Sequence, residues 1–231
     1  MASIPNWSLG SGTGTTITCT LTFTPTAGKI LYVAAAWDKS ATPFSSLSGF
    51  TNIAQAVGTS VSGSVWYKIA TGAETSVAVT ATAAPTGGGN VWVAEIDANN
   101  FVAATNPTYS DTAVASYSTG TASGTGVAVA FVTVDSVSAV DNGPPYGTWS
   151  NSFTGHPGGA FGAFFRDSGG GTGQAPVGIA YADVIGSAET TFTQQAGETV
   201  DQFWGNVAIF NTVSSGRKAR DPLGMMGLIG G

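Results

Sequence analysis

The stretch TTITCTLTF, residues 15–23, alternates threonines with Ile17, Cys19, Leu21 and Phe23. Strict alternation is typical of a strand with one buried face, because successive strand residues point to opposite sides of a sheet. We therefore predict a half-buried strand here. The chain has one cysteine, so an intramolecular disulfide is excluded, and we interpret Cys19 as a small buried hydrophobe.

Comparable short apolar runs recur along the chain and are separated by turn signals such as PTGGGN and SGGGTG. They span residues 29–37, 50–57, 64–70, 75–83, 90–98, 126–134, 159–165, 177–185, 189–195 and 204–211. A bridge rich in Ser, Thr and Gly connects the fifth run to the sixth, and no window has the period of a long amphipathic helix. About a dozen short strands at roughly ten-residue spacing predict an all-β sandwich or barrel.

The two halves of the chain, about 15–105 and 112–211, resemble each other in sequence. SVWYKIATGAET parallels GIAYADVIGSAET, NVWVAEID parallels WGNVAIFN, and YVAAAWDKS parallels AFVTVDS. The second half is longer between its matched segments, and the additional residues must lie within 141–176, which is rich in Gly and aromatic residues. We predict one sandwich domain over residues 1–211, followed by an extended tail, 212–231.

Three segments of the first half, GFTNIAQ, GSVWYKIATGAETSVAVTATA and NVWVAEIDA, resemble a module of tailed-phage virion proteins and some bacterial surface proteins. In that module an apolar strand precedes a G-[FW]-T element, a strand-turn of the form YK-A-tG-E and a closing aromatic strand. The match covers residues 29–98, and a weaker second copy extends it to about 211. Here SGF stands where the module has a Pro-Gly-Trp turn before Thr51. The resemblance implies a jelly-roll-like antiparallel sandwich with a structural or adhesive role.

The composition argues against several classes of partner. Charged residues make up 9% of the chain and the formal net charge is −6, so there is no broad basic surface for nucleic acid. The first residues, MASIPNWSLGSGTG, lack the basic and apolar regions of a secretory signal. No apolar run approaches the roughly 20 residues needed to span a bilayer. We therefore expect neither a nucleic-acid nor a membrane partner.

Candidate catalytic groups are sparse. His156 is the only histidine, and no G-x-S-x-G element accompanies it for a Ser-His-Asp hydrolase. Glu95 and Asp97 lie two apart on a predicted strand and could flank a glycosidic bond, but we favour two solvated acids at a strand end. One Cys and one His cannot supply a zinc site. We predict a protein without catalytic residues, metal or cofactor.

The aromatic-rich segment 141–176 is a candidate receptor-binding or glycan-binding loop, because aromatic faces bind sugars and peptides. Tyr146 and Trp149, beside two prolines, are the better contact candidates, and His156 lies in the same loop. The alternative for the phenylalanines at 159–165 is an ordinary core strand, which we favour.

The tail combines a basic cluster with an apolar run. Arg217, Lys218 and Arg220 fall within four positions, in an otherwise acidic chain. The apolar residues that follow are Leu223, Met225, Met226, Leu228 and Ile229. Burying these five yields roughly 10 kcal/mol, less than the backbone entropy of ordering some 16 residues at about 1–2 kcal/mol each. The tail is therefore predicted to bind a preformed groove or sheet edge; the alternative is packing on its own sandwich.

Together these features predict a non-enzymatic phage virion protein, most simply a capsid decoration or cement protein at the particle surface. Its partners would be the major capsid protein, other virion proteins and copies of itself, with a trimer plausible. Low charge suits this role, because the cores of protein interfaces are depleted in charged residues. The alternative is a tail-associated or surface adhesin that binds a carbohydrate or host receptor.

Overall fold

The computed structural model describes residues 4, 6–38, 43–59, 61–85, 88–110, 116–136, 147–155, 177–194 and 200–212. These residues contain no helix, and every pairing between their strands is antiparallel. The all-β prediction is confirmed for this part of the chain.

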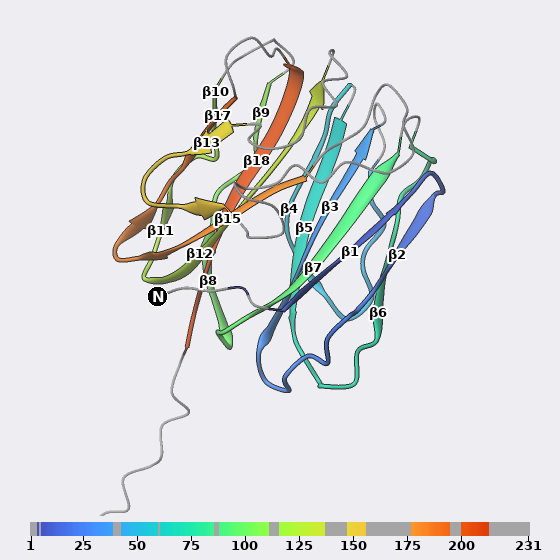
Figure 1. Cartoon of the computed structure of the whole chain (residues 1–231), viewed down its shortest axis with the longest axis horizontal. Coiled ribbons are helices and arrows are strands. Elements are labelled where there is room, and N and C mark those ends of the chain that lie inside the picture. The colour runs from blue at the N-terminus through green and yellow to red at the C-terminus, as the bar shows by residue number, and fades with distance from the viewer. Residues whose placement is uncertain are drawn as a thin grey trace, which may run out of the picture.

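The first half of the chain forms one large sheet and one small sheet (Figure 1). The large sheet has the spatial order β1 (Trp7–Gly12), β7 (Gly89–Ile96), β3 (Ile30–Asp38), β5 (Val61–Ile69), β4 (Thr51–Val57). The small sheet pairs β2 (Thr16–Thr20) with β6 (Ser76–Thr80).

The strands from residue 100 onward likewise form one large sheet with small sheets beside it. The large sheet has the order β14 (Thr154–Gly155), β15 (Val177–Val184), β12 (Gly126–Ser136), β18 (Val200–Asn211), β8 (Asn100–Ala104), and β9 (Thr108–Ser110) also pairs with β18. One small sheet has the order β10 (Ser116–Ser118), β17 (Thr191–Gln194), β13 (Gly147–Trp149). The other pairs β11 (Ala122–Ser123) with β16 (Ser187–Ala188).

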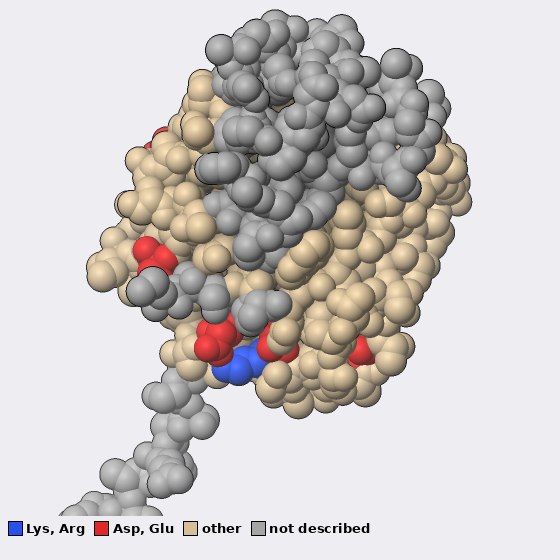
Figure 2. Space-filling model, in the orientation of Figure 1, with Lys and Arg blue, Asp and Glu red and all other residues tan. Residues whose placement is uncertain are grey.

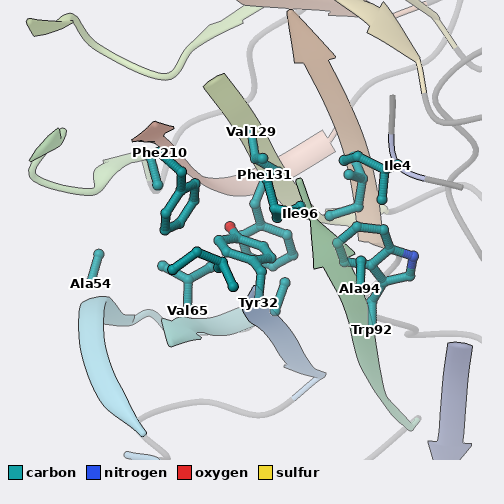
Figure 3. Packing of buried hydrophobic residues seen from close by; sticks show 14 of the residues in the cluster. Ile4, Tyr32, Ala54, Val65, Trp92, Ala94, Ile96, Val129, Phe131 and Phe210 are labelled. Carbon is teal, nitrogen blue, oxygen red and sulfur yellow. The ribbon is translucent and has the colours of Figure 1, made fainter. Parts of the chain in front are cut away.

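The two large sheets pack face to face across a common core (Figure 3). The ring of Tyr32 from β3 meets the edge of Phe210 from β18 at a centroid distance of 5.9 Å. Between the same sheets, Tyr67 from β5 lies edge-to-face with Phe210 at 6.0 Å. Edge-to-face aromatic contacts of this kind add to the burial of large apolar surfaces. The result is a β-sandwich in which one layer contains strands from residues 7–96 and the other contains strands from residues 100–211.

The small sheets cover the outer faces of the large ones (Figure 1). On β2, Ile17 and Cys19 are buried between exposed threonines, as the alternation of TTITCTLTF predicts. Burial raises the pKa of the Cys19 thiol to about 12, so at neutral pH this side chain is an unionised apolar group. Because β2 and β6 cover one face of the first large sheet and the second large sheet covers the other, β3 is buried on both faces.

The predicted strand runs within the described residues coincide with β2 to β7, β12, β15, β17 and β18. The run at 159–165 lies outside the described residues. No strand was predicted for the bridge between the fifth and sixth runs, where the structure has β8 to β11, or for β1. These strands contain mostly Ser, Thr, Gly and Ala, so no apolar alternation marks them. Backbone pairing with a neighbouring strand defines them instead.

Candidate functional site

Most of the residues predicted to bind partners lie outside the described part of the chain: Arg217, Lys218, Arg220, Leu223, Met225, Met226, Leu228 and Ile229, together with Tyr146 and His156. The structure does fix the start of the 212–231 segment. Asn211 accepts a hydrogen bond from the Asn100 side chain at 3.0 Å, and the Thr212 hydroxyl donates to the Asp97 carbonyl at 3.4 Å. Thr212, the first residue of the segment, therefore lies beside the end of β7.

Trp149 is the predicted contact residue that the structure describes. It lies on β13, is half-buried, and its ring meets Phe192 edge-to-face at 5.0 Å. Its indole nitrogen is buried without a hydrogen-bond partner among the described residues. Trp149 therefore contributes to the packing of the outer layer, and replacing it would change that packing as well as any binding surface.

The carboxylates of Glu95 and Asp97 each have structural partners. Glu95 accepts hydrogen bonds from the Thr26 backbone and hydroxyl groups and, at 3.4 Å, from the Asn6 side chain. Asp97 forms an ion pair with Lys29. Figure 2 shows few charged side chains on the face in view, with most of them gathered at its lower end. Asp97 is exposed, as predicted for a solvated acid, whereas Glu95 is half-buried and held by hydrogen bonds.

A more highly organised charged group, which sequence reasoning did not single out, lies at the turn between β5 and β6. The Glu74 carboxylate accepts hydrogen bonds from the Thr71 amide and hydroxyl, both at 2.9 Å, and from the Gly72 amide at 3.1 Å. Lys68 Nζ lies 2.6 Å from the same carboxylate, whose side chain is 9% exposed. Burial raises the pKa of Glu74, but the ion pair with Lys68 and the hydrogen bonds outweigh it and bring the pKa to about 2. The T-x-x-E spacing of Thr71 and Glu74 was the available signal.

A groove of about 580 Å³ adjoins this ion pair and runs along the free edge of β6. Residues 45–48 and β6 line its sides, and Phe50, Lys68 and Glu74 complete the lining. We call it the β6 edge groove. Its volume is in the range of clefts that hold ligands, and hydroxyl groups and backbone dominate its polar surface. A site of this composition can bind another backbone or a polar ligand, but it has no evident nucleophile–base pair.

The backbone of β6 presents two residues to this groove. Leu21 N–H donates to the Thr75 carbonyl and Ala81 N–H to the Thr15 carbonyl, so odd-numbered residues of β6 face β2. Since backbone groups alternate between the two edges of a strand, Ser76 and Ala78 face the groove. Within the described part of the chain, no hydrogen bond reaches the backbone groups of these two residues.

No cluster of three His, Cys, Asp or Glu side chains suited to a metal occurs among the described residues. In the same part of the chain, no helix has the length and apolar character that would let it cross a membrane. Comparison of the chain with protein-family models, curated proteins and solved structures finds no match in any of the three.

Proposed function

We propose that the chain is a non-enzymatic structural protein of a phage particle, a capsid decoration or cement protein that holds shell subunits together. The observation that carries the proposal is that charged side chains contact other groups of the same chain. Lys29, Lys68, Glu74, Glu95 and Asp97 all contact other groups of the chain, as does Glu189. The surface left for contacts is rich in hydroxyl groups and glycine. Such a surface suits repeated protein contacts, because buried charges are costly at interfaces.

The mechanism would be clamping. A protein that binds the assembled shell but not its free subunits stabilises the shell by mass action, and many identical weak contacts add up through avidity. The sandwich would rest on the shell, while the basic residues Arg217, Lys218 and Arg220 of the 212–231 segment approach an acidic partner surface. The major capsid protein and further copies of this chain are the proposed partners.

We further infer that the sandwich is a duplicated jelly-roll-like unit. Two features support this. The order β1-β7-β3-β5-β4 in one sheet has its counterpart in the order β8-β18-β12-β15-β14 in the other. A glycine in the left-handed region also precedes each of the matching glutamates: Gly72, with φ of 86°, lies two residues before Glu74, and Gly186, with φ of 88°, lies three residues before Glu189.

Particles of the encoding phage that lack this protein provide the test. The full chain should bind them saturably and raise the temperature at which they disassemble. A triple variant, Arg217→Glu, Lys218→Glu and Arg220→Glu, should bind at least tenfold more weakly at physiological salt while melting like the wild type. Absence of binding by the wild-type chain, together with binding to immobilised glycans, would replace this proposal with the adhesin.

A further inference from the structure

The small outer sheets of the two halves differ at one edge. In the second half, β13 lies against the side of β17 that faces away from β10. Ser150 N–H donates to the Thr191 carbonyl at 3.0 Å, and Thr148 lies opposite Thr193. These two β17 residues follow Glu189 just as Ser76 and Ala78 follow Glu74. The positions that a strand covers in one half are therefore the positions that face the β6 edge groove in the other.

Among its described residues, the first half contains only the beginning of such a third strand. Phe44 forms an isolated bridge with Ala81, and Ser45 N–H donates to the Thr80 carbonyl at 2.8 Å. From Ser46 onward the chain makes no backbone hydrogen bond to β6 among the described residues. The β6 edge groove lies between β6 and the residues that follow Ser45, where this backbone pairing stops.

We propose that the β6 edge groove accepts residues 221–231 of a second copy of this chain, which adds to β6 as a further strand. An edge strand with unpaired N–H and C=O groups is a template for such addition. The inference rests on the proposed function in one respect, namely that the 212–231 segment makes intermolecular contacts. It adds the site that receives this segment, namely the β6 edge groove of another copy of the same chain.

The length and composition of the segment fit this occupant. The 19 residues after Thr212 span roughly 60 Å when extended, whereas a domain of this size has a radius of gyration of about 17 Å. The segment can therefore reach an adjacent copy. Gly224 and Gly227 allow its backbone to approach β6 between the groove walls, and Leu223 and Met225 supply side chains for the apolar groove residues Leu47 and Phe50. Arg217 and Lys218 would be steered by the acidic charge of the neighbouring sandwich.

The first test measures self-association of the full chain by sedimentation velocity over a range of concentrations. Ala78→Pro removes the outward N–H of β6 without touching a hydrogen bond to β2, and it should weaken self-association at least tenfold. Ala78→Ser keeps that N–H and is the matched control, which should assemble like the wild type. A peptide of residues 221–231 should dissociate wild-type assemblies. A monomeric wild-type chain, or undiminished assembly of a folded Ala78→Pro chain, overturns the inference.

A cross-linking test decides the case even if Ala78→Pro does not fold. One full-length chain carries Ser76→Cys and another carries Met226→Cys, and the two are mixed under mild oxidation. A disulfide between the two different chains supports the inference, and buried Cys19 should not react. A third chain carries both substitutions. If a disulfide forms within this chain and none forms between different chains, the segment binds its own groove, and the inference is overturned. Particle binding by the wild-type chain tests the proposed function separately: if the chain does not bind particles while the cross-link forms, only the proposed function fails.

Discussion

The turns TGAET and GSAET place a glutamate at matching points of the two halves, yet the surroundings of the two carboxylates differ. Glu74 is held by its own turn and by Lys68, with its side chain 9% exposed. Glu189 is exposed and accepts hydrogen bonds from Ser118 and Thr121, which lie far earlier in the chain. A similar sequence element thus has local partners in one half and distant partners in the other.

The residue before each turn glycine shows the cause of this difference. Thr71 precedes Gly72 and donates two hydrogen bonds to Glu74, whereas Ile185 precedes Gly186, has no donor on its side chain and is 91% exposed. The residue three positions before Glu189 is Gly186, which has no side-chain donor, so Glu189 lacks the contact that Thr71 makes with Glu74. Two turns of similar sequence, each with a glycine in the left-handed region, are therefore stabilised by different side-chain contacts.

The largest predicted loss of stability is at Trp204, and it tests whether the two large sheets unfold together. Trp204 is fully buried between the two large sheets, so Trp204→Ala should lower the free energy of unfolding by about 3–5 kcal/mol. Urea titration followed by circular dichroism and by fluorescence measures this. Because the core is shared, both probes should report one transition. Two separate transitions in the wild-type chain would show that the halves unfold independently.

The next prediction concerns Gly63 of β5, whose backbone lies close to the Trp204 ring of the opposite sheet. A Cβ at Gly63 of β5 would lie 2.7 Å from a ring atom of Trp204, whereas a Cβ at Gly205 of β18 would meet nothing nearer than 3.4 Å. Gly63→Ala should cost about 3 kcal/mol through overpacking, and Gly205→Ala less than about 1 kcal/mol. Thermal melts of the two variants measure the difference. Equal losses would mean that the interface can relax around the added methyl group.

The third prediction compares how much Glu74 and Glu189 each contribute to the free energy of unfolding. Glu74→Gln removes a partly buried ion pair and should cost about 2 kcal/mol, while the matching Glu189→Gln, at an exposed site, should cost less than about 1 kcal/mol. Since the pKa of Glu74 falls from 4.5 to about 2 on folding, its stabilising contribution is complete above about pH 4.5 and is lost as the pH falls towards 2. The stability gap between wild type and Glu74→Gln should therefore narrow below pH 4.5. A constant gap down to pH 2 would contradict this assignment.

The smallest effect compares the turn glycines. Gly72 and Gly186 both have φ in the left-handed region, so Gly72→Ala and Gly186→Ala should each cost about 1 kcal/mol. A Cβ at Gly72 would also lie 3.4 Å from the Ala27 side chain, whereas at Gly186 it would meet nothing within 4 Å. Chemical denaturation should show that Gly72→Ala has a slightly lower free energy of unfolding than Gly186→Ala. A stabilised Gly186→Ala would mean that this turn changes conformation.

Much of the fold was predictable because its central strands are buried on alternate residues or on both faces. Ile17 and Cys19 marked β2, and the unbroken apolar run from Ile30 to Trp37 marked β3. The candidate groove was less accessible to sequence reasoning. It depends on where residues 45–48 diverge from β6, and serines in that segment carry no signal for or against pairing.

Local sequence pattern is enough to assign the all-β class, the burial of Cys19 and most strand positions, since alternation and turn residues act over a few neighbouring positions. Three features became visible only in the folded chain: the two large sheets face each other, Lys68 pairs with Glu74, and one edge of β6 stays open where the matching edge of β17 is covered. Those outcomes depend on contacts between residues distant along the chain, and such contacts are selected by how whole sheets pack.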